Sequence, residues 1–464
     1  MAPLQRFALL VFLALLSLAE AGILSLSVSR RGPDSTSLLR RDGTLNLTTR
    51  YTWGTEGYYV NMGVGEPVQN LHFLLHTTTS LSWVLSAPAY GCKEIPGLGL
   101  GWCQQTFNPE KSSTFSLVDQ DALKLGEEAR TPRFRGFYFN DTVTIQGKQI
   151  KNQHLGLAFK NSRFESVIGL GLQASDASKE NNATTIIDSM VENGIIDVPV
   201  FSLYLNGADA ESGTILFGGV DSKKYHGTLA TIPLMPDPKS HLAGGDVTSY
   251  AIHLRGLEVD GLQLDPLDTH AIMDASDSRT VLPREHVTKI YKHFGVYMND
   301  SYYMALIDCA YGREKGKAIS FRFNFSGQSI VVPMREMIFD AKDGPIHRSF
   351  GDEELNKVAD GWESICYFGI VPPSRNDDQS AQTVYLGDSF LRSSYVVFDQ
   401  ANLQIGLAQA IENATESNII KMKKGEKKFP DAVAAEAKAR ILGPSVNTVT
   451  CLLITAAALL AFVL

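Results

Sequence analysis

Positive charge and long apolar runs are both scarce in this chain of 464 residues. Lysine and arginine number 42 against 50 aspartate and glutamate residues, which gives a net charge of −8. A chain with this balance offers no basic surface to nucleic acid, which argues against such a partner. No uninterrupted apolar run reaches the roughly 20 residues that cross a bilayer as a helix. The histidine and cysteine residues also lack the close spacing of metal ligands, so we expect neither a metal nor another cofactor.

The composition is that of a globular protein. Hydrophobic residues make up 44% of the chain and charged residues 20%, and the length is enough for two to three globular units around a large core. The mildly acidic balance suits a secreted protein.

Both ends of the chain have the pattern of processing signals. Arg6 precedes a short apolar stretch that ends in Ala19-Glu20-Ala21, so we predict that residues 1–21 are a signal peptide. Residues 446–464 contain an uncharged apolar run that continues to Leu464. A glycolipid (GPI) anchor signal is the favoured interpretation of this tail, and a membrane helix is the alternative. Either would attach a protein of the secretory pathway to the plasma membrane or the cell wall.

Two further segments differ from the globular part. Residues 22–41 contain the paired basic residues Arg30-Arg31 and Arg40-Arg41. This pattern favours a short propeptide, although the pairs could also be ordinary surface residues. Residues 411–445 are rich in charge and alanine, so we expect a charged stalk, either a solvated helix or a flexible segment.

Cysteines and glycosylation motifs agree with a secreted protein. Of the five cysteines, Cys451 lies in the apolar tail, and the remaining even number favours disulfides. Six Asn-X-Ser/Thr motifs predict N-glycosylation on exposed loops. Their asparagines are Asn46, Asn140, Asn182, Asn299, Asn324 and Asn413.

The central part of the chain predicts a fold of short strands. Apolar and polar residues alternate between turns that contain Gly, Pro and Asn. The expected strands include residues 58–65, 71–75, 137–145, 201–205, 214–217, 318–325, 329–332 and 394–398. Only residues 184–192 and 283–294 have a helical pattern, and the second begins with a proline suited to a first helical turn. The predicted class is all-β with small helices.

Two loops share one layout, an apolar run followed by a polar residue and small hydroxylated residues. They are Leu74-Leu75-His76-Thr77-Thr78-Thr79 and Ala271-Ile272-Met273-Asp274-Ala275-Ser276-Asp277. With Val167-Ile168-Gly169-Leu170-Gly171 and Tyr385-Leu386-Gly387-Asp388, they resemble pepsin-like aspartic endopeptidases (peptidase A1), in the fungal secreted and GPI-anchored yapsin-like branch. The resemblance spans about residues 57–410.

This resemblance implies a bilobal pepsin-like fold with two related β-barrel-like lobes. We expect the N-terminal lobe at 50–240 and the C-terminal lobe at 241–410, in a monomer whose cleft between the lobes binds a peptide or protein. The positions of four cysteines are similar to those of the family's disulfides, which implies the pairs Cys92–Cys103 and Cys309–Cys366.

The catalytic residues depart from the family pattern. The family uses two aspartates that share one proton and activate one water molecule. Asp274 matches the second aspartate, whereas His76 replaces the first. The supporting loop residues are Thr77, Thr78, Ala275, Ser276 and Asp277.

Most of these supporting positions are altered as well. Thr77 is kept, but Ala275 lacks the hydroxyl of the equivalent threonine, so we expect a one-sided tie between the loops. Thr78 and Ser276 carry side chains where glycine is usual, and Asp277 adds a carboxylate close to Asp274. In the flap segment, Ala129 takes the place of the family's tyrosine.

Three hypotheses about function follow. The first is a catalytically impaired homologue, a pseudoprotease that retains a peptide-binding cleft. The second is an active histo-aspartic endopeptidase that uses His76 and Asp274, for which a plasmepsin branch with histidine at the first position is a precedent. The third is a cleft that uses the same two residues as acid and base on a small molecule.

Overall fold

The computed structural model describes residues 22–29, 57–90, 105–125, 134–161, 165–173, 184–210, 212–236, 247–299, 304–340, 353–374 and 382–431. The chain divides into two compact units, Met1–Ala432 and Val433–Leu464, and every described residue belongs to the first. Strands dominate this part and the helices are few and short, so the predicted all-β class is confirmed. None of the helices in the described ranges is long and apolar enough to cross a membrane.

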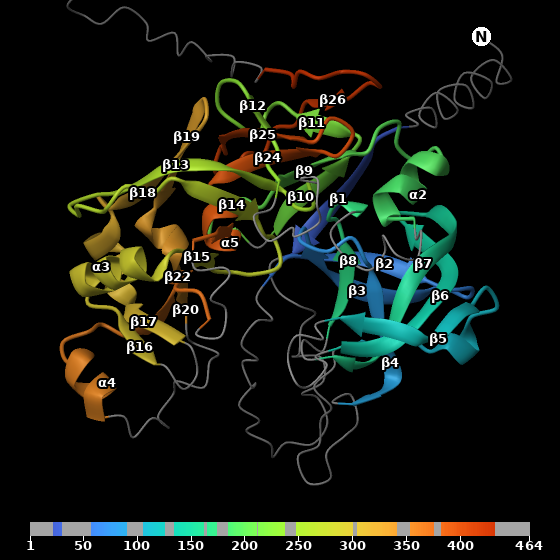
Figure 1. The fold of residues 1–464 in the computed structure, drawn as a ribbon, viewed down its shortest axis with the longest axis horizontal. Helices are drawn as coiled ribbons and strands as arrows, with labels where there is room; N and C mark the ends of the chain where they lie inside the picture. Colours follow the sequence, from blue (N-terminus) through green and yellow to red (C-terminus); the bar gives the residue numbers. More distant parts are fainter. Residues whose placement is uncertain are drawn as a thin grey trace, which may run out of the picture. The chain divides into compact units, whose positions relative to one another are not determined.

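The largest sheet has 13 strands. Their bounds are β1 (Leu24–Ser29), β2 (Tyr59–Val64), β3 (Gln69–His76), β4 (Trp83–Tyr90), β5 (Ser116–Leu125), β6 (Phe134–Ile145), β7 (Lys148–Asn161), β8 (Ser166–Gly169), β9 (Val200–Tyr204), β10 (Ser212–Phe217), β12 (Ala230–Pro233), β24 (Ser394–Asp399) and β25 (Gln404–Gln409). The strand order is β12-β25-β24-β9-β10-β1-β2-β3-β8-β4-β7-β6-β5, and β2 also pairs with β6 (Figure 1). That extra pairing closes strands β2, β3, β8, β4, β7 and β6 into a barrel.

The second half of the chain forms a separate set of sheets. A seven-stranded sheet has the order β19-β18-β13-β14-β23-β15-β22. Its bounds are β13 (Ala251–Val259), β14 (Thr269–Met273), β15 (Thr280–Val281), β18 (Ser320–Phe325), β19 (Gln328–Pro333), β22 (Ile370–Val371) and β23 (Val384–Leu386). A four-stranded sheet, β16-β17-β21-β20, consists of β16 (Tyr297–Asn299), β17 (Met304–Asp308), β21 (Ile365–Phe368) and β20 (Ile338–Asp340). The two related sets of strands agree with the expected bilobal fold.

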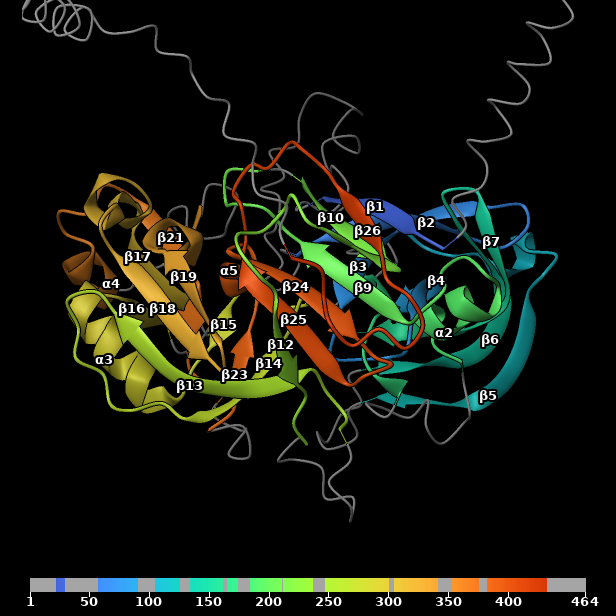
Figure 2. The ribbon, with the colours of Figure 1, turned by 90° about the horizontal axis from the view of Figure 1, so that it is seen from above.

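Strands of the 13-stranded sheet also come from the end of the chain. β24 and β25 run antiparallel and continue the sheet beyond β9, with β12 on their other side (Figure 2). The first and last parts of the folded chain therefore share one sheet with the first lobe.

The two predicted helices form where their capping residues indicate. Thr185 accepts a hydrogen bond from the backbone of Asp188 and begins α2 (Ile186–Glu192). Pro283 precedes α3 (Arg284–Phe294), which ends at Gly295 in the left-handed conformation. The short helices α4 (Glu353–Val358) and α5 (Asp388–Leu391) were not predicted.

The segment predicted as a propeptide contributes a strand to the core. β1 pairs antiparallel with β10 over six residues, from Leu24↔Phe217 to Ser29↔Ser212. Its apolar residues Leu24, Leu26 and Val28 are buried, which accounts for the alternation of apolar and serine residues in this stretch.

The expectation of a solvated stalk is wrong for residues 411–431, which we call the C-terminal strap. Strand β26 (Ile419–Lys421) of the strap pairs with β11 (Gly219–Asp221), and Met422 and Phe429 are buried on either side of an exposed lysine-rich turn. These two apolar anchors bind the strap to the sheet despite its many charged residues. Residues 432–445 lie outside the described part.

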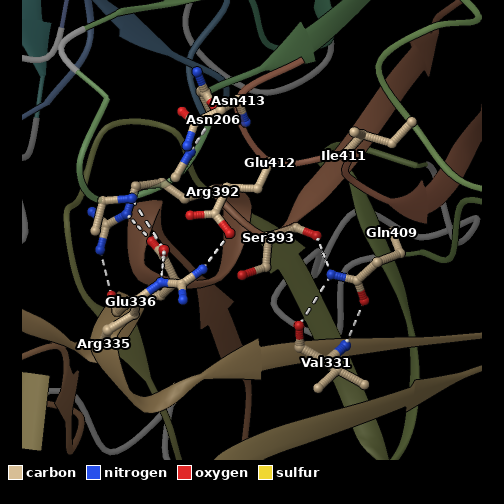
Figure 3. A network of polar contacts seen from close by, with 12 residues as sticks. Asn206, Val331, Arg335, Glu336, Arg392, Ser393, Gln409, Ile411, Glu412 and Asn413 are labelled. Carbon is tan, nitrogen blue, oxygen red and sulfur yellow. Dashed lines mark hydrogen bonds and ion pairs between the residues drawn. The ribbon is translucent and has the colours of Figure 1, made fainter. Parts of the chain in front are cut away.

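A polar network connects four separate parts of the chain (Figure 3). Arg392 Nε donates to Glu336 Oε2 at 2.7 Å, and the Ala208 backbone N–H donates to Glu336 Oε1 at 3.0 Å. Arg335 forms an ion pair with Glu412 of the strap. The network therefore joins the turn after β9, the segment after β19, the end of α5 and the start of the strap.

Candidate active site

The two loops singled out in the sequence begin at equivalent places in the fold. The first follows β3, which pairs in parallel with β8 so that His76 lies opposite Gly169. The second follows β14, which pairs in parallel with β23 so that Met273 lies opposite Leu386. One residue further, Asp274 and Gly387 take the places of His76 and Gly169. His76 and Asp274 thus occupy matching positions in the two lobes.

An apolar segment that ends in glycine crosses behind each loop, as the resemblance implies. Behind the first loop, Leu170 N–H donates to His76 O at 2.8 Å and Gly171 N–H to Thr79 O at 2.7 Å. A β-carbon on Gly169 would lie 2.5 Å from the backbone oxygen of Leu81, so a side chain has no room there.

The crossing segment of the second loop is built in the same way. Asp274 N–H donates to Leu386 O at 3.0 Å, and Asp388 N–H donates to Asp277 O at 2.9 Å. A β-carbon on Gly387 would overlap the backbone oxygens of Asp277 and Arg279. Close backbone packing therefore fixes both loops.

Thr77 joins the two loops. Its buried hydroxyl donates to Met273 O at 2.7 Å and accepts from Ala275 N–H at 3.0 Å. Ala275 is also buried, and its methyl group offers no hydroxyl in return. Thr77 thus provides a side-chain connection between the two loops.

Tyr250 provides a second connection behind the first loop. Its buried hydroxyl donates to Leu170 O at 2.7 Å and accepts from Gln400 Nε2 at 2.7 Å. Burial raises the pKa of the Tyr250 phenol well above its ordinary value, so the group stays a neutral donor.

The imidazole of His76 is half-buried and lies between a hydroxyl and an indole. Thr78 Oγ1 is 3.2 Å from His76 Nδ1, and the centroids of the His76 and Trp83 rings are 6.2 Å apart in an edge-on arrangement. Trp83 Nε1 donates to Glu165 O at 3.1 Å, which holds the indole in place. Thr78 therefore contacts the His76 ring directly.

The carboxylate of Asp274 is bound by its own loop. Ser276 donates twice to Asp274 Oδ1, through its backbone N–H at 3.0 Å and through its hydroxyl at 2.6 Å. Ser276 thus orients Asp274 and occupies part of its capacity to bind a water molecule.

The additional carboxylate of Asp277 has a cationic partner. Arg279 Nε and Nη2 donate to Asp277 Oδ1 and Oδ2 at 3.0 and 2.9 Å, and the Arg279 backbone N–H also donates to Oδ1. Sequence reasoning singled out Asp277 but missed Arg279. The spacing of the two residues, an arginine two positions after an aspartate in a turn, could have indicated this ion pair.

The other predicted sites divide into described and undescribed residues. Cys309 and Cys366 form a disulfide with Cα atoms 5.0 Å apart, as the resemblance implies. Asn413 is exposed, whereas the Asn324 side chain donates to Glu258 and the Asn140 side chain contacts His154. Of Asn299 only the backbone is described, in β16. Cys92, Cys103, Asn46, Asn182 and Ala129 lie outside the described residues.

Within the described ranges, no group of three or more His, Cys, Asp or Glu residues could hold a metal ion. The acid–base groups placed at the loop ends are one imidazole and one carboxylate. An imidazole and a carboxylate cannot share a proton in the way that two like carboxylates do.

Comparisons with known proteins agree with this architecture. A family model described as Eukaryotic aspartyl protease matches residues 57–410. The chain is 29% identical over 411 residues to Probable aspartic-type endopeptidase opsB of Aspergillus oryzae, an alignment that covers 84% of this chain and 77% of that relative. Acid protease of Saccharomycopsis fibuligera is 29% identical over 373 residues, with 79% and 83% covered. Gastricsin of Homo sapiens is 27% identical over 386 residues, with 80% and 86% covered. The chain thus belongs to the eukaryotic aspartyl protease family.

Proposed function

We propose that this protein is a secreted, cell-surface homologue of aspartic-type endopeptidases that binds peptides between its lobes and is impaired in proteolysis. The observation that carries this proposal is the pairing of positions in the two lobes. His76 lies opposite Gly169, in the place that corresponds to that of Asp274. One of the two carboxylates that define the family's chemistry is thereby replaced by an imidazole.

The replacement changes the acid–base chemistry at acidic pH. Two adjacent carboxylates share a proton, so that one acts as base while the other acts as acid. An unperturbed imidazole is protonated in the same pH range, and it then favours an ion pair with a carboxylate over activation of water. The two hydrogen bonds from Ser276 to Asp274 Oδ1 add to this effect.

An active histo-aspartic endopeptidase is the second candidate. The preserved scaffold favours it, because Thr77 still joins the loops and both crossing segments remain tightly packed. In this case Asp274 would act on a water molecule and His76 would supply or accept the proton. Removal of either residue would then abolish hydrolysis.

The location is proposed from the ends of the sequence. Residues 1–21 have the pattern of a signal peptide and residues 446–464 that of an anchor signal or membrane tail. We propose that the ligand of the cleft is a peptide or a protein segment, because the relatives of this chain are named as endopeptidases.

Hydrolysis and binding measurements on the full-length protein test the proposal. We would assay a mixture of peptides from pH ~3 to ~7 with the unmodified protein, with Asp274→Asn and with the double variant His76→Asp/Thr78→Gly. The proposal expects no Asp274-dependent hydrolysis by the unmodified protein. It also expects that a peptide inhibitor with a tetrahedral hydroxyl group binds without turnover.

The variants distinguish the two candidates. Hydrolysis by the unmodified protein that disappears in both Asp274→Asn and His76→Asn would establish the histo-aspartic enzyme instead. Hydrolysis gained only by the double variant would support loss of the reaction on an intact scaffold. Absence of inhibitor binding to any folded variant would contradict the peptide-binding role.

A further inference from the structure

Exposed lysines are concentrated in one turn of the C-terminal strap. We call residues 423–428 the lysine turn, and its exposed lysines are Lys423, Lys424, Lys427 and Lys428. We propose that the lysine turn binds anionic phospholipid headgroups of the membrane to which the C-terminal tail attaches the protein. This inference rests on the proposed attachment through residues 446–464, and it adds a contact between the folded part of the protein and the lipid surface.

Charge is the first observation in favour of this contact. The lysine turn contains four lysines and one glutamate and so has a net charge of +3, in a chain whose net charge is −8. Two other lysines of this region are neutralised, because Lys421 forms an ion pair with Asp197 at 2.5 Å and Lys223 forms one with Glu416 at 3.4 Å. Within the described ranges, the four ammonium groups of the lysine turn have no such carboxylate partner. Their charge is available to an external anion.

The backbone of the lysine turn is held in one shape. Lys423 N–H donates to Glu426 Oε2 at 2.9 Å, and Glu426 N–H donates to Lys423 O at 3.1 Å. Two amide side chains at the start of β25 hold the same backbone from behind. Asn402 Nδ2 donates to Glu426 O at 3.0 Å. Gln404 Nε2 donates to Lys427 O at 2.9 Å. A turn that is already ordered loses less conformational entropy when it binds a ligand.

The outer side of the lysine turn is open. Gly425 adopts the left-handed conformation at φ 82°, and a β-carbon built on it meets no atom of the described part within 4 Å. Met422 and Phe429, on either side of the turn, are buried in a cluster with Tyr225 and Tyr395. The apolar residues therefore face the protein and the lysines face outward, so that a flat charged surface can approach the turn.

The lysine turn is also close in sequence to the proposed membrane attachment. Residues 432–445 separate the strap from the apolar tail, and a connection of this length spans at most about 50 Å when fully extended. A basic cluster next to a membrane attachment attracts anionic headgroups, and each lysine raises the binding constant about fivefold. Charges more than about 8 Å away are screened at physiological ionic strength, so the negative charge of the whole chain does not prevent this local attraction.

Chemical labelling of the lysines tests the proposal. The full-length protein would be reconstituted into vesicles of phosphatidylcholine and into vesicles of an equal mixture of phosphatidylcholine and phosphatidylglycerol. A water-soluble acetylating reagent would modify exposed ammonium groups, and mass spectrometry would give the rate at each lysine. Rates would be expressed relative to Lys317, whose side chain is 74% exposed, to correct for molecules that face the vesicle interior.

We expect the lysines of the turn to react at least about fivefold more slowly in the anionic vesicles than in the neutral ones. High salt should remove this protection, because it screens the attraction. Equal labelling rates in the two kinds of vesicle would overturn the proposal.

A matched pair of variants tests whether the lysines act together. Lys427→Gln/Lys428→Gln removes two charges from the turn, whereas Lys148→Gln/Lys151→Gln removes two exposed charges from the first lobe. We expect the protection of the two remaining lysines of the turn to fall below about twofold in the first variant and to be unchanged in the second. Equal protection in both variants would contradict the proposal.

Two further measurements separate this inference from its alternatives. Protection by a soluble sulfated polysaccharide, with none by anionic vesicles, would assign the lysine turn to a polysaccharide and overturn the lipid contact. Flotation with neutral vesicles in high salt reports attachment through the tail by itself. If the protein does not float there, the proposed attachment fails, and labelling with anionic vesicles added at low salt still decides whether the lysine turn binds lipid.

Discussion

At the scale of single residues, Thr77 shows how one hydroxyl connects two loops. The variant Thr77→Val keeps the shape of the side chain but removes the bonds to Met273 O and Ala275 N–H. Because both groups are buried, we expect the free energy of unfolding to fall by about 1–3 kcal/mol in urea denaturation. Thr78→Val is the control, since Thr78 is only half-buried, and its loss should stay below about 1 kcal/mol. Equal losses would argue against the tie.

His154 makes stability depend on pH. Burial lowers the pKa of His154 from its ordinary value of 6.5, its Nδ1 is 3.1 Å from Asn140 Oδ1, and its ring stacks on Tyr138. Below pH 6.5 the unfolded chain therefore takes up a proton that the folded protein disfavours, so the contribution of neutral His154 to stability is present above pH 6.5 and is lost as the pH falls.

The variant His154→Gln tests this effect. Glutamine does not titrate, so we expect Tm to decrease less between pH 7 and pH 5 in His154→Gln than in the unmodified protein. Between pH 7 and pH 8 the two proteins should show parallel changes, which serves as the internal control. The same slope below pH 6.5 in both proteins would show that His154 makes no such contribution.

At the scale of elements, the C-terminal strap depends on a few apolar anchors. The Phe429 ring covers Gly406 of β25, and the strap backbone accepts hydrogen bonds from Tyr225, Asn402 and Gln404. We expect Phe429→Ala to lower the free energy of unfolding by about 3–5 kcal/mol in urea denaturation. Lys428 is exposed next to it, and Lys428→Ala should change this free energy by less than about 0.5 kcal/mol. A flexible stalk would make both substitutions neutral.

Periodicity and capping residues predicted the elements that they specify locally. The strands that became β2, β3, β9 and β10, and the helices α2 and α3, have clear alternation or caps and were predicted close to their observed bounds. β1 also alternates, but its place after a signal peptide favoured the interpretation as a propeptide. The strap was missed because its partner, β11, lies about 200 residues earlier in the chain, and no local pattern indicates such a pairing.

The candidate site was predictable to the extent that it follows from the repeated loops. The equivalence of His76 and Asp274 and the role of Thr77 could be predicted from the motif. The bonds from Ser276 to Asp274 and from Arg279 to Asp277 could not, because they depend on the turn conformation that follows β14. The motif therefore indicates where the functional residues lie. Their hydrogen-bond partners can be identified only from the three-dimensional structure.

At the scale of the whole molecule, the network of Figure 3 contains a buried and an exposed ion pair side by side. Arg392 and Glu336 are 0% and 2% exposed, whereas Arg335 and Glu412 are each 41% exposed. Glu336→Ala leaves a buried guanidinium without its carboxylate, so we expect the free energy of unfolding to fall by about 3–5 kcal/mol.

Glu412→Ala is the matched control for this measurement. It removes a carboxylate from the same network at the surface, where solvent screens the charge, and should cost at most about 1 kcal/mol in the same urea denaturation. Equal effects of the two variants would show that burial of the Arg392–Glu336 pair does not increase its contribution to stability.

The Phe429 anchor also affects how activity data on this family member should be interpreted. The family match ends at residue 410, so a recombinant chain trimmed to that boundary would lack Phe429 and Met422 and would expose Gly406 and Tyr225 to water. Such a chain would be prone to precipitate, and an inactive sample could then be taken as evidence for a lost catalytic site. Measurements of hydrolysis are informative only on protein that extends at least to residue 431.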